Sequence, residues 1–410
     1  MKKILSVIIS MVFILNGIKP VDAFPKVSLN CKYAYVLDGD TSRTMYDKKG
    51  TVKMYPASMT KIMTAYLALT KIDNLDEKIK ISKKDVEGWW AQGASICYFK
   101  KGEKVTYRDL LYGCLFPSGA DACRSLAINT YGSEKKFINA MNETAAALGC
   151  KKTHFVNTTG LHSKNHYTTC EDLTLILREA MNDKRFAKIF TDDEYHSTNK
   201  KHYWVSTLTK TRYYAHREAK QIEGAKSGYT NEAGRCLVSS FMCHGHRMFM
   251  AVGKAPTTKL GTSLIASDKL SKMIIENTKL VTVMEKGTNL LTLNYNYLIP
   301  QYYQYTVPEK MTYLIDSKTK DASYTYKYKG LKTIDHTIKE GDKIGDVDVY
   351  DGQELVVTLP LYAYETIEYD INIYNREHDY VLYGLIAIVA IALGLKALSL
   401  FRHRKKEKIF

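Results

Sequence analysis

A run of mostly apolar residues, 381–401, lies near the C-terminus of this 410-residue chain and contains a single charge, Lys396. A helix rises about 1.5 Å per residue, so a run of this length spans about 31 Å, close to the thickness of a membrane's hydrocarbon core. The basic segment 402–410 follows the run, and such segments stay on the cytoplasmic side. These features predict a transmembrane anchor with a cytoplasmic tail.

The N-terminus has the features of a secretory signal. Lys2 and Lys3 precede an apolar run over 4–15, and the small residue Ala23 closes the segment. This order is typical of a cleaved signal peptide, here residues 1–23. A signal at one end and an anchor at the other predict a single-pass cell-membrane protein whose main body is extracellular. No nucleic-acid partner is therefore expected, although the net charge is +16.

The body between the two ends divides into two predicted domains. Residues 24–280 combine a β-hairpin over 32–49 with helical patterns and then strand patterns over about 222–254. Because the strands come from both ends of this segment, the pattern predicts an α/β domain, an α+β sandwich with helices on a sheet. Residues 281–371 instead alternate apolar and polar side chains between Gly-Asp and Asp-Gly turns, which predicts a small all-β domain.

The first candidate catalytic pair is Ser58 and Lys61. Residues three apart on a helix have Cβ atoms about 5–6 Å apart, so these two side chains can touch. Burial and a helix N-terminus disfavour the charged form of a lysine, and Ser-Lys pairs serve as nucleophile and base. The spacing alone is not specific. It recurs at Ser133/Lys136, Ser197/Lys200 and Ser317/Lys320.

Two further segments support this pair. Ser118 lies in 117–121, which interrupts a helical pattern and can present a hydroxyl to a cleft. Residues 226–228 form the one Lys-Ser/Thr-Gly sequence of the chain, on a predicted strand. Such a strand can align a ligand while its Lys and Ser side chains bind an anionic group. Three signals in this order are more specific than any one of them.

The order Ser-x-x-Lys, Ser-Gly-Ala, Lys-Ser-Gly resembles the penicillin-binding proteins and serine β-lactamases. The closer resemblance is to D-alanyl-D-alanine carboxypeptidases, the low-molecular-weight penicillin-binding proteins. The segments that carry it are 55–64, 155–162, 166–169 and 224–230. The signal, the β-domain and the anchor follow the same layout. The resemblance implies a β-lactamase/transpeptidase-like fold for residues 24–280.

The resemblance also implies a reaction. Ser58 attacks the carbonyl carbon between two terminal D-alanines, Lys61 takes its proton, and Ser118 relays a proton to the leaving D-alanine. Water then hydrolyses the acyl-enzyme, so the net reaction removes one D-alanine from a peptidoglycan stem peptide. No metal or other cofactor is expected, and β-lactams are expected to acylate Ser58 as inhibitors.

The remaining implied roles concern binding. Lys226, Ser227 and Gly228 bind the substrate, with the first two holding its carboxylate. The backbone N–H groups of Ser58 and Tyr229 form the oxyanion hole, in which one lost donor typically costs on the order of 100-fold in rate.

Three features depart from the family pattern. Ser227 replaces the usual Thr but keeps the hydroxyl, and Ala120 stands where an Asn usually positions the substrate. The basic residue that the family places after the last hairpin is not evident over 254–261. Because this amide is missing, a non-catalytic module that binds wall peptides or penicillin is an alternative. Because β-lactamases share the three motifs, a β-lactamase is a second alternative. We expect a serine D,D-carboxypeptidase whose activity is lowered and not abolished.

Overall fold

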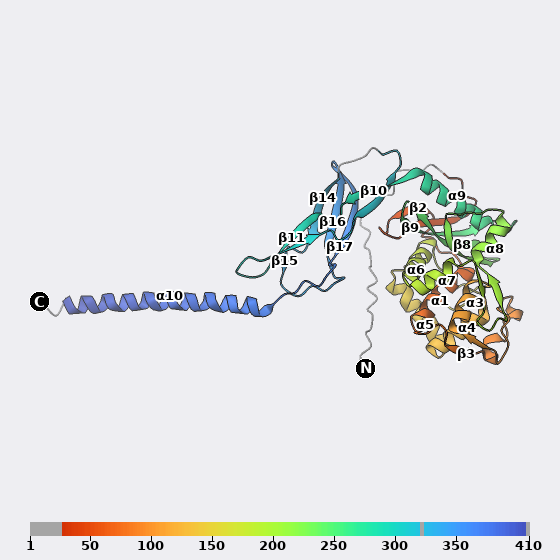
Figure 1. Ribbon diagram of the computed structural model, residues 1–410, viewed down its shortest axis with the longest axis horizontal. Coiled ribbons are helices and arrows are strands. Elements are labelled where there is room, and N and C mark those ends of the chain that lie inside the picture. The colour runs from red at the N-terminus through yellow and green to blue at the C-terminus, as the bar shows by residue number, and fades with distance from the viewer. Residues whose placement is uncertain (1–26, 320–323, 407–410) are drawn as a thin grey trace. The chain divides into compact units, whose positions relative to one another are not determined.

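The computed structural model describes residues 27–319 and 324–406, and the predicted signal lies outside them. These residues form two compact units (Figure 1). The first extends to Leu280 and also includes Leu314–Thr319. The second contains the rest of the described chain.

The centre of the first unit is a five-stranded antiparallel sheet in the order β2-β1-β9-β8-β7. Its strands are β1 (Tyr33–Asp38), β2 (Thr44–Lys48), β7 (Ile222–Thr230), β8 (Gly234–Cys243) and β9 (His246–Ala255). The hairpin predicted over 32–49 is confirmed as β1 and β2, and the strands predicted over 222–254 are confirmed as β7 to β9. The pairing of β1 with β9 joins the two ends of the unit.

Helices cover both faces of this sheet (Figure 1). All six residues of β1 are buried, and they alternate between two cores because successive strand side chains point to opposite faces. Tyr33, Tyr35 and Leu37 face one core, whereas Ala34 and Val36 face the other. The unit is therefore the predicted sandwich of helices on a sheet.

The larger core is formed with six helices, which are α1 (Lys61–Leu69), α3 (Tyr107–Leu115), α4 (Ala120–Tyr131), α5 (Glu134–Ala147), α6 (Cys170–Asn182) and α7 (Lys184–Thr191). The other core is formed with α8 (Thr207–Ala215) and α9 (Thr262–Asn277). Short elements complete the unit: η1 (Ala57–Thr60), α2 (Lys83–Val86), η2 (Trp90–Gln92), β3 (Lys78–Lys80), β4 (Lys104–Thr106), β5 (Glu194–His196) and β6 (Tyr203–Val205). All eight cysteines are free thiols.

The second unit is built from strands up to residue 362, which confirms the all-β prediction. Three strands form a sheet in the order β12-β11-β15, and three more form a sheet in the order β14-β16-β17. The strands of this part of the chain are β10 (Thr278–Met284), β11 (Asn289–Tyr295), β12 (Tyr302–Thr306), β13 (Met311–Asp316), β14 (Tyr324–Gly330), β15 (Thr333–Ile334), β16 (Lys343–Asp351) and β17 (Glu354–Tyr362).

The predicted transmembrane helix over 381–401 is wrong. The chain does form a long helix there, α10 (Ile371–Lys406), but no helix within the described residues is long and apolar enough to cross a membrane. The first turns of α10 carry Arg376, Glu377 and Asp379.

Candidate active site

Ser58 lies in η1, directly before α1, and the two elements place it beside Lys61. The Lys61 Nζ donates to Ser58 Oγ at 3.1 Å and to the carbonyl oxygen of Thr159 at 2.5 Å. Lys61 is 3% exposed, whereas Ser58 is half-buried. The amine is thus fixed against the hydroxyl by a second bond to the backbone, which is the geometry required of a base for a serine nucleophile.

Ser118 lies in the break between α3 and α4. Pro117 cannot continue a helix, and Ser118 has the left-handed φ of +65°. Such a conformation is costly for a residue with a side chain and is concentrated at functional sites. The break points the Ser118 hydroxyl at β7, where the Lys226 Nζ donates to its Oγ at 3.1 Å.

Lys226 is fully buried on β7, and its Nζ also donates to the carbonyl oxygen of Ser227 at 2.9 Å. Burial, assisted by the nearby charge of Lys61, lowers the pKa of Lys226 to about 7. Near neutral pH a substantial part of Lys226 is therefore uncharged. A lysine of this kind can pass a proton to or from the Ser118 hydroxyl.

These side chains open onto one cavity of about 430 Å³. The predicted site residues that line it are Ser58, Ser118, Lys226, Ser227, Gly228 and Tyr229. Lys61 lies behind Ser58 and does not line the cavity. Ala120 is fully buried at the start of α4 and does not line it either. The structure thus brings together residues more than 160 positions apart in the sequence.

The backbone of β7 lies against the nucleophile. A Cβ added to Gly228 would be 3.0 Å from the Ser58 backbone nitrogen and 2.9 Å from the Pro56 carbonyl oxygen. Contacts this short are tighter than ordinary van der Waals distance, so this position requires glycine. Tyr229 follows Gly228 on β7 and lines the same cavity as Ser58, as the predicted oxyanion hole requires.

The loop that holds Lys61 is a feature to which sequence reasoning gave no role. The Asn157 Oδ1 accepts hydrogen bonds from the backbone nitrogens of Gly160 at 2.7 Å and Thr159 at 3.1 Å. This turn aims the Thr159 carbonyl at Lys61. The sequence signal is the Asn-Thr-Thr-Gly turn, since Asn side chains readily bond to the backbone two or three residues on.

His166 supports the nucleophile from the other side. The Val156 backbone nitrogen donates to its Nδ1 at 3.1 Å, so its hydrogen lies on Nε2, which donates to Thr60 Oγ1 at 2.8 Å. Thr60 Oγ1 donates in turn to the Ala57 carbonyl oxygen at 2.9 Å. Burial, assisted by the charges of His154, Lys61 and His162, lowers the pKa of His166 to about 3. The ring is therefore neutral in this site.

Acid should destabilise the first unit through His166. In the unfolded chain the His166 ring takes up a proton near pH 6.5, whereas in the folded site it stays neutral down to about pH 3. The stability of the fold therefore falls as the pH falls through this window. Between pH 7 and pH 4 the wild type should lose about 3 kcal/mol more than His166→Gln. Urea unfolding can be followed by the fluorescence of the three tryptophans, all in this unit. Equal losses in the two proteins would contradict the neutral buried ring.

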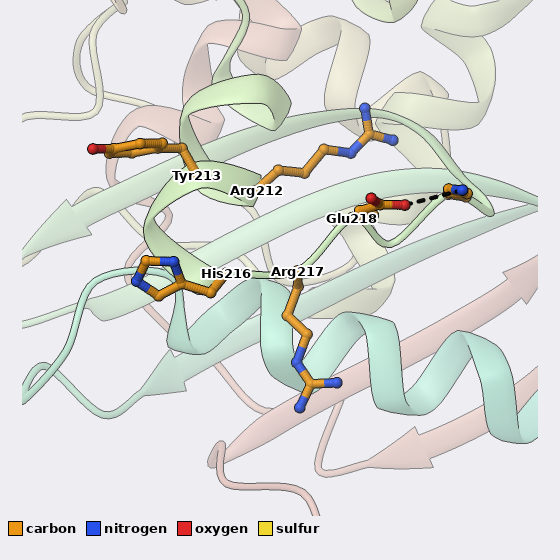
Figure 2. A pocket seen from close by; sticks show the side chains of 6 residues that line it. Arg212, Tyr213, His216, Arg217 and Glu218 are labelled. Carbon is orange, nitrogen blue, oxygen red and sulfur yellow. Dashed lines mark ion pairs between the residues drawn. The ribbon is translucent and has the colours of Figure 1, made fainter.

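A second cavity, of about 570 Å³, does not offer a comparable site. Figure 2 shows that its Arg212 and Arg217 side chains point in opposite directions, and Lys220 is paired with Glu218 at 3.0 Å. Among the described residues, Asp38, Asp40 and His246 are close enough together to hold a metal ion. None of these three lines the cavity at Ser58.

A family model described as D-alanyl-D-alanine carboxypeptidase, peptidase S11, matches residues 21–257, more than half of the chain. The chain belongs to the D-alanyl-D-alanine carboxypeptidase family. The resemblance predicted from the three motifs is thereby confirmed. A second model, the C-terminal domain of penicillin-binding protein 5, matches residues 279–369 of this carboxypeptidase-family chain.

Curated relatives and solved structures agree with this family. The D-alanyl-D-alanine carboxypeptidase DacF of Bacillus subtilis is 34% identical over 233 residues, which cover 56% of this chain and 58% of DacF. The Escherichia coli carboxypeptidase DacC is 26% identical over 378 residues, 87% of this chain and 88% of DacC. Penicillin-binding protein 5 of Haemophilus influenzae has a TM-score of 0.69 at 20% identity, over 84% of this chain and 100% of that protein, and shows the shared fold.

Proposed function

We propose that this chain is a serine D,D-carboxypeptidase that removes the terminal D-alanine from wall peptides ending in D-Ala-D-Ala. The observation that carries the proposal is the pair of contacts beside one cavity. Lys61 Nζ lies 3.1 Å from Ser58 Oγ, and Lys226 Nζ lies 3.1 Å from Ser118 Oγ. One pair supplies a nucleophile with a base, and the other supplies a proton path to a leaving group.

In acylation, the Ser58 oxygen attacks the carbonyl carbon of the penultimate D-alanine while Lys61 takes the hydroxyl proton. The N–H groups of Ser58 and Tyr229 stabilise the oxyanion that forms. The bond to the Thr159 carbonyl keeps the amine aligned during the transfer. The C–N bond then breaks and leaves the acyl group on Ser58.

The leaving amine needs a proton, and Ser118 is placed to supply it. Its hydroxyl proton passes to the amine and is replaced from Lys226, whose pKa of about 7 suits exchange in either direction near neutral pH. After D-alanine leaves, Lys61 gives up to solvent the proton that it took from Ser58, and Lys226 regains one. In deacylation a water molecule attacks the acyl carbon, Lys61 takes its proton, and that proton passes to the Ser58 oxygen as the acyl bond breaks. One peptide bond is hydrolysed for each D-alanine released.

The lifetime of a labelled penicillin on the protein tests this proposal against its alternatives. A carboxypeptidase should form a long-lived adduct on Ser58, because its deacylation machinery is arranged for a peptide and not for the retained β-lactam leaving group. Rapid release would instead indicate a β-lactamase. Absence of any adduct would indicate a module that binds wall peptides without chemistry.

We further propose that the first unit acts outside the cytoplasm, where stem peptides of the wall are found. The predicted signal over 1–23 supports export of the chain. A mature protein that begins at Phe24, read from its N-terminal sequence, is the expected result. Recovery of the intact N-terminus from the exporting host would contradict it.

A further inference from the structure

Trp90 is the most exposed large apolar side chain among the described residues of the first unit, with 77% of its surface open to solvent. Within the described chain its indole N–H has no hydrogen-bond partner, and its ring contacts no other ring or cation. Tryptophan side chains are on average largely buried, since they carry a large apolar surface. The Trp90 ring is therefore available to a ligand, and its surroundings indicate which kind.

The backbone around Trp90 is fixed without help from the Trp90 side chain. The neighbouring Trp89 is 3% exposed, and its Nε1 donates to the Asp85 carbonyl oxygen at 2.7 Å. The turn of η2 is closed by backbone bonds from the Gly93 nitrogen to the Trp90 carbonyl oxygen at 3.0 Å and from the Ala94 nitrogen to the Trp89 carbonyl oxygen at 3.1 Å. An aromatic ring on a support that is already ordered loses little entropy when a ligand stacks on it.

Trp90 lies on a segment that borders two cavities. Gly93 and Ser95 line the catalytic cavity, whereas Trp89 and Gln92 line a neighbouring cavity of about 510 Å³. Trp90 precedes the first of the residues that line the catalytic cavity by only three positions. A ligand that leaves the catalytic cavity over this segment therefore meets the Trp90 ring and then the neighbouring cavity.

The neighbouring cavity offers amide groups. The side-chain amide of Asn139 lines it and has no hydrogen bond within the described chain. The Gln92 amide nitrogen donates to the Gly88 carbonyl oxygen at 3.1 Å, and its amide oxygen accepts no hydrogen bond from a described residue. The one carboxylate in the lining, Glu134, is paired with Arg124 at 3.5 Å.

An exposed indole ring beside free amides suits a sugar. The C–H groups on one face of a sugar ring carry a partial positive charge, and they stack on the negative face of an aromatic ring. Amide oxygens accept hydrogen bonds from hydroxyl and acetamido groups, and amide nitrogens donate to them. Neither interaction requires a charge on the ligand.

We propose that Trp90, assisted by Gln92 and Asn139, binds an N-acetylated sugar of the glycan strand to which the stem peptide is attached. This inference rests on the proposed carboxypeptidase function and names a part of the substrate that the catalytic cavity does not hold. When the penultimate D-alanine lies at Ser58, a stem of four residues extends at most about 14 Å to the sugar. The glycan strand therefore passes over the protein close to the catalytic cavity, where Trp90 is exposed.

The test compares a free pentapeptide ending in D-Ala-D-Ala with the same pentapeptide attached to a disaccharide of N-acetylglucosamine and N-acetylmuramic acid. The wild type should have a kcat/KM about 5- to 20-fold higher for the disaccharide-linked peptide, mainly through a lower KM. Trp90→Ala should remove most of this preference, Trp90→Tyr should keep part of it, and Asn139→Ala should lower it by a smaller factor. Tyr302→Ala removes an exposed aromatic ring of the second unit and is the matched control, which should keep the wild-type preference.

Covalent labelling by penicillin reports whether each variant keeps a folded site. A wild type without the preference, or a labelled Trp90→Ala with the wild-type preference, would overturn the inference. If Trp90→Ala does not label, Asn139→Ala decides, and a wild-type preference in that variant overturns the inference. Weaker binding of Trp90→Ala to phospholipid vesicles together with an unchanged preference would also overturn it and would identify a membrane contact.

A binding measurement separates this inference from the proposed function. If the wild type releases no D-alanine from either substrate, the proposed function is rejected, and the inference is tested by calorimetry with the disaccharide-linked tetrapeptide, which lacks the terminal D-alanine. Its Kd should be at least about 5-fold weaker for Trp90→Ala than for the wild type. Equal Kd values for the two proteins would overturn the glycan site.

Discussion

Ser58→Ala should abolish the covalent penicillin adduct and lower the release of D-alanine by at least about 10⁴-fold. The change removes one hydroxyl from a half-buried position, and the backbone of η1 is held by independent contacts, so the fold should be retained. Mass spectrometry of the protein after incubation with penicillin measures the adduct and identifies the peptide that carries it.

Ser133→Ala is the matched control for this experiment. Ser133 has the same spacing to a lysine, but its Oγ accepts a hydrogen bond from the Lys136 backbone nitrogen at the start of α5, and it does not line the cavity. The adduct should form at the wild-type level in Ser133→Ala. An adduct at the wild-type level in Ser58→Ala would show that the nucleophile lies elsewhere.

Gly160→Ala should lower the rate of acylation by about 100-fold or more and destabilise the first unit. The φ of Gly160 is +85°, and a Cβ there would be 1.8 Å from the Ala57 carbonyl oxygen and 2.9 Å from the Ser58 backbone nitrogen. The segment that carries the nucleophile must therefore move, and a shift of about 1 Å can cost about 100-fold in rate. Acylation by a chromogenic β-lactam measures the effect.

Gly149→Ala separates this collision from ordinary backbone strain. Gly149 has a φ of +80°, but nothing lies within 4 Å of the Cβ that alanine would add. Gly149→Ala should cost about 1–2 kcal/mol of stability from the left-handed conformation alone, with acylation unchanged. Similar acylation rates in the two variants would contradict the account of how Gly160 holds the nucleophile.

Much of the site could be predicted from local sequence. The Ser58–Lys61 contact follows from a helical spacing, and Pro117 marks the break that presents Ser118. The strand that carries Lys226 was visible in the apolar pattern. These predictions succeed because each depends on residues that are neighbours in the chain.

The remaining parts depend on how distant segments meet. The Thr159 carbonyl reaches Lys61 only after the loop packs against α1, and no local pattern contains that contact. Arg235 enters the cavity because the register of β7 and β8 sets it opposite Tyr229. The anchor prediction over 381–401 is the part that failed, because no helix within the described residues is long and apolar enough to cross a membrane.

The most direct test of the account is the release of D-alanine from a peptide ending in D-Ala-D-Ala, by the wild type beside Ser58→Ala. Ala120 lacks the amide that usually orients the substrate, but Ser58, Lys61, Ser118 and Lys226 are all in place. The rate of D-alanine release is therefore expected to be about 5- to 150-fold below that of family members with the amide, and not zero. The account predicts release by the wild type that is clearly above that of Ser58→Ala. Equal background rates from the two proteins would contradict it and leave a wall-binding module.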